Sequence, residues 1–465
     1  MEGMTFFSPA APDPLVTMAD GTVKQVNPFS GTEVWTVPGR GDRPLATPVR
    51  NASPLRPEDF TDSCAFCSDN QLSTPPEKSR LVRSSEGDWD GDGWALRQRL
   101  LPSQLGEERA EFRRVPNLFE IVSYNYWAKN YGYEMPSAQR EWMDTYLADP
   151  AGRSHLLDIA RRRLGSAADG ASEEELLKLA PSYFGGGHDV IIARRHFVDD
   201  ATDDSQLASS GTLTPDEHFG FITLTIDAMR DLYDTNRYAP YVAVFQNWLS
   251  PAGASFDHLH KQLVAIDERG ASNDWEIAKL RHNANMYNEL AVNHAFYHNL
   301  VIAENEHAIL LAGVGHRYPT MVVYSKSAAA EPWLMRADEA RCFSDLLHAA
   351  HAATGPQVPC NEEWHHKPID LDVAMPLRVN LKWRVSTLAG FEGGTKIYVN
   401  TISPSNIRER ITRRLVELRE QGRISDTIRV ADECTPVRNC LRYNPSLSWE
   451  ADPHVTDRVH LHHHP

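Results

Sequence analysis

The segment Gly253-Ala254-Ser255-Phe256-Asp257-His258-Leu259-His260-Lys261-Gln262 carries the sharpest pattern in the sequence. His258, His260 and Gln262 alternate with other residues, so a strand through this segment would place all three side chains on one face. An imidazole is a competent nucleophile toward an activated phosphorus, and an amide can hydrogen-bond a phosphoryl oxygen without adding charge. Gly253 and Ser255 can offer backbone N–H groups and a hydroxyl to a phosphate. Two histidines packed in a core are the alternative, but the combination favours phosphoryl chemistry at His260.

The composition excludes several classes of protein. A formal net charge of -16 argues against a general binder of nucleic acid or of acidic membranes, because such proteins need a basic footprint. The sequence contains no run of 18 apolar residues, and the first 20 residues lack the pattern of a secretory signal, so we expect no membrane span and no export. Six Cys in 465 residues do not make a disulfide framework. These features predict a cytoplasmic protein.

The chain repeats one order of elements. A strand at 190–193, a helix opened by Thr214 and Pro215, and a strand at 241–245 are followed later by a strand at 321–324, a helix at 338–352 and a strand at 378–381. We also expect a long amphipathic helix at about 274–299 between these passages and a helical insertion at about 136–180. The fold class predicted is α+β, with two related halves.

Several motifs along the chain together resemble those of a known family. The segment around His260 resembles the active-site strand of the galactose-1-phosphate uridylyltransferase branch of the histidine-triad superfamily, in which Gln replaces the third His. The other matching motifs are Asn27-Pro28, Arg40-Gly41-Asp42-Arg43-Pro44, Cys64-Ala65-Phe66-Cys67, Arg114–Phe119, His188–Ile192 with His196, Asn247 six residues before Gly253, and Ala389-Gly390-Phe391-Glu392.

The resemblance implies a nucleotidyltransferase of nucleotide-sugar or galactose metabolism built from duplicated histidine-triad-like domains, each an antiparallel sheet with helices. It implies a catalytic domain at 1–265, a second domain at 266–425 and a tail at 426–465. His260 would carry the nucleotide as a phosphoramidate, while Gln262 and Ser255 would contact the transferred phosphoryl group. The substrate-binding residues implied are Arg40, Arg43, Asn117, Asn247, Gly253 and Glu392.

The partners implied are a nucleotide sugar, a sugar 1-phosphate and a second copy of the chain, with Glu392 completing the partner's nucleotide site. Taken without the resemblance, Arg40 and Arg43 fit either a phosphate clamp or a solvated surface.

Cys64 and Cys67 form a Cys-x-x-Cys pair that fits zinc binding, redox work or chance. No thioredoxin-like strand–helix context surrounds the pair, which weakens the redox interpretation. Together with His196 and His258, the two thiols would complete a tetrahedral zinc site, as the resemblance implies. Such a Zn²⁺ ion would hold the loop beside His260 and would not activate water. We expect no dedicated metal site in the His-rich tail at 459–465, where any metal binding would be adventitious.

Some residues depart from the family pattern. Leu259 stands where Pro is usual, Lys261 where Gly or Ser is common, and Glu120 where Pro usually follows the Asn-x-Phe run. The Gly-Ala-Ser opening also occurs in phosphorylase-like relatives. The alternatives are therefore a phosphorylase or hydrolase of a nucleotide sugar or dinucleoside polyphosphate, and a non-catalytic nucleotide-binding protein on the same scaffold.

Overall fold

The computed structural model describes residues 13–39, 52–84, 93–435 and 437–448. Arg40 and Arg43, expected to bind phosphate, lie outside the described residues. No helix in these ranges is long and apolar enough to cross a membrane.

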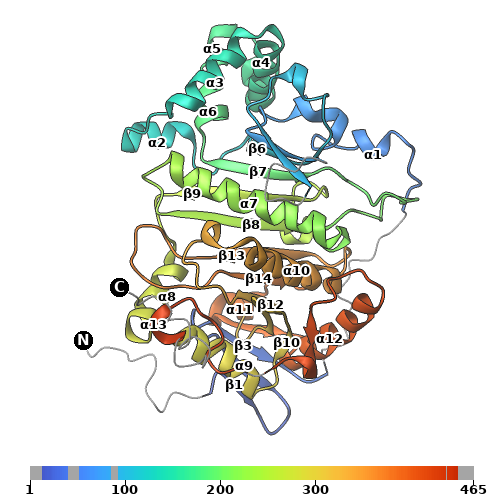
Figure 1. Cartoon of the computed structure of the whole chain (residues 1–465), viewed down its shortest axis with the longest axis vertical. Helices are drawn as coiled ribbons and strands as arrows, with labels where there is room; N and C mark the ends of the chain where they lie inside the picture. The colour runs from blue at the N-terminus through green and yellow to red at the C-terminus, as the bar shows by residue number, and fades with distance from the viewer. Residues whose placement is uncertain (1–12, 40–51, 85–92, 436, 449–465) are drawn as a thin grey trace, which may run out of the picture.

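One antiparallel sheet of twelve strands runs through most of the molecule (Figure 1). Its strands follow one another across the sheet in the order β16 (Arg429–Val430), β10 (Val301–Glu304), β11 (Ala308–Ala312), β12 (Thr320–Ser325), β14 (Arg378–Trp383), β13 (Cys360–His365), β8 (Tyr241–Trp248), β9 (His260–Ile266), β7 (His188–Ala193), β6 (Ala110–Pro116), β4 (Ser79–Arg83) and β5 (Trp94–Gln98). A smaller sheet joins β1 (Leu15–Thr17), β2 (Val23–Val26) and β3 (Glu33–Thr36) to β15 (Ile397–Asn400).

The large sheet is duplicated about its centre, where β8 pairs with β13. Outward from that pair, β9 and β14 occupy matching places, as do β7 and β12. One long helix belongs to each half, α7 (Pro215–Thr235) and α10 (Ala337–Thr354), and the two pack on each other. The predicted α+β fold with two related halves is confirmed, whereas the domain boundary near residue 266 stays a prediction.

The predicted insertion is helical. Four helices, α3 (Ser137–Ala148), α4 (Pro150–Leu164), α5 (Glu173–Leu177) and α6 (Ala180–Gly185), stand at one end of the molecule with α2 (Tyr124–Tyr131) below them (Figure 1). Trp142, Tyr146 and Phe184 form the centre of a separate small core. The insertion therefore packs as a unit next to the half of the large sheet that carries β6 and β7 (Figure 1).

The prediction of one long helix at about 274–299 is wrong. Helix α8 (Ala271–His282) ends where Asn283 adopts an extended conformation, and the chain becomes helical again as a π-turn (Asn288–Asn293) that leads into α9 (His294–Tyr297). Asn283 accepts a hydrogen bond from the backbone N–H of Asn285, and Asn288 binds the backbone of Leu441. Asn side chains that bond to backbone groups compete with the helix, which explains the break.

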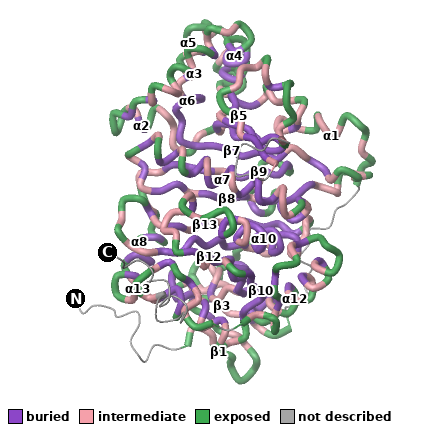
Figure 2. The backbone as a smooth tube through the Cα atoms, in the orientation of Figure 1, coloured by how far each residue is buried: buried purple, intermediate pink, exposed green. Residues whose placement is uncertain are grey.

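Successive side chains of β9 point to opposite faces of the sheet. On one face His260 lies beside Ile192 of β7, and Gln262 lies beside Phe245 of β8. Lys261 points to the other face, toward α7, where its ammonium lies over the ring of Phe221. Figure 2 shows that the central strands are buried.

Candidate active site and metal centre

Four side chains that can bind a metal ion lie close together at the N-terminal end of β9. Cys64 and Cys67 come from the turn between α1 (Asp59–Asp62) and the 3-10 helix η1 (Ser68–Ser73), His196 follows β7, and His258 precedes β9. Their ligand atoms all lie within 4.8 Å of one another. The closest pairs are Cys67 Sγ to His196 Nδ1 at 3.4 Å and Cys64 Sγ to His258 Nδ1 at 3.5 Å. Two thiols and two imidazoles within this space can hold a metal ion.

The hydrogen bonds around this cluster leave the metal-binding atoms available. His258 Nε2 donates to the carbonyl oxygen of Ala193 at 2.6 Å, so the Nδ1 lone pair faces the two sulfurs. The hydrogen bond from Cys64, with those of His196 and His258, lowers the pKa of Cys67 although burial opposes this.

His260 has one polar partner recorded in the described chain. Its Nδ1 lies 2.7 Å from the carbonyl oxygen of His258, so Nδ1 carries the proton and Nε2 keeps its lone pair. Burial lowers the pKa of His260, more than the bond to His258 raises it. A neutral imidazole with a free Nε2 is the form that attacks phosphorus.

The aromatic ring of Phe66 links the two parts of the site. Phe66 lies between the two cysteines, and its ring packs edge-on against His260, with 5.3 Å between centroids, and stacks near Phe256 at 4.4 Å. Its carbonyl oxygen accepts a hydrogen bond from the buried guanidinium of Arg113. The loop that offers the thiols therefore also fixes one side of the His260 ring.

A chain of hydrogen bonds orients Gln262. The N–H of Ile121 donates to His188 Nδ1, so His188 Nε2 carries the proton and donates to Gln262 Oε1 at 3.1 Å. Asn117 accepts from the N–H of Phe119 and donates to the same oxygen at 3.3 Å. The Gln262 oxygen is thereby occupied, and its NH₂ group is left to donate to a phosphoryl oxygen.

Asn247 is held by the second half of the chain. It lies on β8, where Asn361 of β13 donates to its Oδ1 at 2.7 Å and also to the carbonyl oxygen of Ala252. Arg384 in turn donates to Asn361. The amide nitrogen of Asn247 is therefore oriented toward the turn that contains Gly253.

Gly253 has a φ of 90°, which only glycine adopts at little cost. Ser255 lies two residues further along the same loop and is exposed, with no polar contact recorded for its hydroxyl.

Glu392 lies apart from this group. It belongs to the short helix α11 (Gly390–Thr395), where it is partly exposed and accepts a hydrogen bond from the N–H of Ala389. The ring of Phe391 in the same helix lies 6.3 Å, between centroids, from that of Trp35 in the smaller sheet, and α11 lies in the lower half of Figure 1, below β9. Within one described chain, Glu392 does not join the site of His260.

The matching strand of the second half has no histidine. On the face that holds His260 and Gln262, β14 carries Arg378, Asn380 and Lys382. Arg378 is paired with Glu276 of α8 at 2.6 Å, and Lys382 with Glu363 at 2.5 Å.

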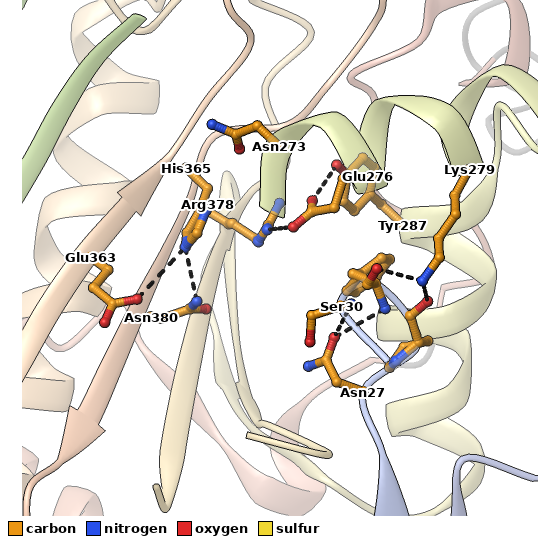
Figure 3. Close-up of polar contacts among 12 residues, drawn as sticks. Asn27, Ser30, Asn273, Glu276, Lys279, Tyr287, Glu363, His365, Arg378 and Asn380 are labelled. Atoms are coloured by element: carbon orange, nitrogen blue, oxygen red, sulfur yellow. Dashed lines mark hydrogen bonds and ion pairs between the residues drawn. The ribbon is translucent and has the colours of Figure 1, made fainter. Parts of the chain in front are cut away.

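These groups line a cavity of about 420 Å³. Figure 3 shows Arg378 and Glu276 on one side of it and Asn27 and Ser30 on another. In the second half, Arg378 and Lys382 are thus paired with carboxylates, and β14 has no counterpart of His260.

Comparison with known proteins gives the family. A family model described as "Domain of unknown function (DUF4921)" matches residues 18–443. The chain belongs to this family. No curated protein matches the sequence.

Solved structures share the fold of this DUF4921 protein. The crystal structure of an ADP-glucose phosphorylase from Arabidopsis thaliana with bound ADP-glucose has a TM-score of 0.53 and 16% identity, and covers 84% of this chain and 98% of its own. A GalT-like protein from Arabidopsis thaliana has a TM-score of 0.51 with the same identity and coverage. The DUF4921 protein thus shares the fold of these two structures, as the resemblance to the galactose-1-phosphate uridylyltransferase branch predicted.

Proposed function

We propose that this protein is a nucleotidyltransferase that moves a nucleoside monophosphate from a nucleotide sugar to a sugar 1-phosphate through a covalent nucleotidyl-His260. The observation that carries the proposal is the hydrogen bond from His260 Nδ1 to the His258 carbonyl oxygen, which leaves a neutral Nε2 free. The NH₂ group of Gln262, on the same face, is the donor for the phosphoryl oxygen.

The proposed reaction has two displacements. In the first, His260 Nε2 attacks the α-phosphorus, the N–P bond forms, and the bond from that phosphorus to the bridging oxygen breaks to release a sugar 1-phosphate. In the second, a phosphate oxygen of the acceptor attacks the same phosphorus and the N–P bond breaks. The ring becomes cationic in between, and its Nδ1–H bond to the His258 carbonyl stabilises that charge.

A panel of nucleotide-sugar donors and phosphate-bearing acceptors tests this proposal. Purified protein is incubated with UDP-glucose or ADP-glucose and with galactose 1-phosphate or inorganic phosphate as acceptor, and the products are identified. We expect exchange with a sugar phosphate. Product made only with inorganic phosphate would establish the phosphorylase alternative, which the fold of the ADP-glucose phosphorylase and the Gly-Ala-Ser opening favour. No turnover with any pair would favour a nucleotide-binding protein.

The pH dependence of the first step follows from the environment of His260. Burial lowers its pKa below the ordinary 6.5, so the reactive neutral ring persists at mildly acidic pH. We expect the rate of nucleotidyl-enzyme formation to stay level from about pH 8 to the ordinary imidazole value and to fall only in more acidic buffer. Single-turnover labelling across this range measures it. A decline centred at or above the ordinary value would contradict the proposed nucleophile.

We propose that Cys64, Cys67, His196 and His258 hold Zn²⁺. The donor set and the tautomer of His258 fit this ion. When bound, zinc would supply a structural cross-link that fixes Phe66 against His260, and the transfer itself would remain the work of His260 and Gln262.

Replacing Cys67 by Ser should remove one equivalent of zinc per chain. The labelling rate should then fall roughly 10-fold or more, because the loop that positions His260 loosens. Elemental analysis and single-turnover labelling measure the two effects. Cys342→Ser, at a partly buried thiol outside the cluster, is the control. Unchanged zinc in Cys67→Ser would contradict the assignment.

We propose that two chains complete each other's sites. Phe119 and Ile121 are each 68% exposed beside Asn117, and Phe391 and Leu388 are exposed beside Glu392. Docking of the 388–395 segment on a second chain would cover both apolar surfaces and bring Glu392 to the nucleotide. Arg40 and Arg43, as the resemblance implies, would bind the sugar phosphate, and the cytoplasmic location stays a prediction.

Mixing two inactive variants tests this arrangement. His260→Ala and Glu392→Ala chains should each be impaired alone, whereas co-expressed chains should regain about a quarter of the wild-type activity, since random pairing gives half mixed dimers with one intact site. No recovery in purified mixed dimers would show that each chain builds its own site.

A further inference from the structure

A second group of metal-binding side chains lies far from the first. Asp13, just before β1, lies close to His294, the first residue of α9, and to His298, which caps the C-terminal end of that helix. His294 Nε2 lies 3.2 Å from Asp13 Oδ1, and His298 Nε2 lies 3.1 Å from Asp13 Oδ2. The three ligand atoms lie within 4.8 Å of one another.

We propose that Asp13, His294 and His298 form a second site for a divalent transition metal, with zinc as the ion that fits it. Residues four apart on a helix point the same way, so His294 and His298 present a pair of nitrogens to one ion. Two imidazoles and one carboxylate match the three-ligand zinc sites that keep a fourth position for water.

The spacing of the ligand atoms supports an ion between them. Bonds of 2.0–2.2 Å to a tetrahedral zinc place neighbouring ligands about 3.3–3.5 Å apart. The contacts at Asp13 approach this value, as do the sulfur-to-nitrogen contacts of the Cys64 cluster. The imidazoles are largely covered, with 13% and 19% of their side chains exposed, whereas 42% of Asp13 is exposed and leaves space for water.

The site would combine two neutral imidazoles with one ionised carboxylate. Each neutral imidazole would carry its proton on Nδ1 and give the Nε2 lone pair to the metal, while Asp13 supplies one negative charge. The rings of His294 and His298 lie with centroids 4.2 Å apart, so one ion reaches both. The site has no thiol, which distinguishes it chemically from the Cys64 cluster.

The consequence is a cross-link between the start of the described chain and the second half of the fold. Asp13 precedes β1, and the small sheet that begins there includes β3 and β15. A metal at Asp13 would hold this sheet against the 288–298 helical segment. This role is independent of the reaction proposed at His260, so the two can fail separately.

Metal counting on the full chain tests the site. Metal-free protein is loaded with Zn²⁺, freed of excess ion, and analysed for zinc per chain in wild type, Asp13→Asn and His294→Gln/His298→Gln. The control is His282→Gln, which removes an exposed histidine on α8. We expect both site variants to hold one zinc fewer than wild type and the control to hold the same number. Zinc on the His-rich tail is common to all four and cancels.

Two further readouts make the result decisive. With Co²⁺, the Cys64 cluster should show thiolate-to-metal absorption, and this band should be unchanged in Asp13→Asn. Zinc should slow hydrogen exchange in residues 15–26 several-fold in wild type but not in Asp13→Asn. Equal zinc counts in wild type and Asp13→Asn would overturn the proposal, and if the double variant unfolds, the Asp13→Asn count decides.

Discussion

Replacing His260 by Ala should lower nucleotidyl transfer by at least about 10⁴-fold, because both displacements pass through its Nε2. His260 is 5% exposed and bonds only the His258 carbonyl among recorded polar partners, so its loss leaves the rest of the site in place. The measurement is kcat with the best donor and acceptor pair.

Two controls separate chemistry from folding in this variant. Zinc content and thermal stability should match wild type, because His260 is not among the four metal-binding side chains. His282→Ala, at an exposed histidine on α8, should retain full activity. A His260→Ala enzyme with a tenth or more of wild-type turnover would show that another group carries the reaction.

Replacing Lys261 by Met should destabilise the fold by about 3–5 kcal/mol, because it leaves a buried carboxylate without its cation. Lys261 and Glu362 are both fully buried and ion-paired across the sheet. Burial alone would raise the pKa of Glu362, but Lys261 and His351 together hold it well below its ordinary range. The remaining donors to Glu362 are His351 at 2.7 Å and Trp364 at 2.5 Å.

Denaturant unfolding measures this loss, with Lys129→Met on the exposed surface of α2 as the matched control. Adding Glu362→Gln to Lys261→Met should restore most of the lost free energy of unfolding, since no uncompensated charge remains. If Lys261→Met lies within about 1 kcal/mol of the control, the pair does not join the two halves as the structure suggests.

The local pattern in the sequence predicted the placement of two of the candidate site residues. The alternation predicted one shared strand face for His258, His260 and Gln262. Strand β9 begins at His260 and carries His260 and Gln262 on one face, whereas His258 precedes the strand. The four metal-binding positions lie in three distant segments and were assembled through the family resemblance, and the structure brings them together.

The sequence did not predict the contacts of residues that reach the candidate site through strand pairing. His188 contacts Gln262 because β7 pairs with β9, and Asn361 contacts Asn247 because β13 pairs with β8 across the two halves. Neither pairing can be deduced from local periodicity. Asp13 meets His294 over 281 residues of sequence, which is equally invisible to spacing.

The break at Asn283 was missed for a different reason. The apolar periodicity of 274–299 continues through it, and only the hydrogen bonds of Asn283 and Asn288 to nearby backbone reveal why the helix stops. Local side-chain bonds of this kind override a helical pattern. The sequence pattern therefore predicted that helix is present in this segment better than it predicted where the helix ends.

The most direct test of the central claim is to trap the intermediate and locate it. Protein incubated with an α-labelled nucleotide sugar and no acceptor is denatured in base, digested and analysed by mass spectrometry. We predict an acid-labile, base-stable nucleoside monophosphate on the peptide containing His260, which a phosphate-bearing acceptor discharges. Turnover with no protein-bound label, or label on any other residue, would contradict the mechanism.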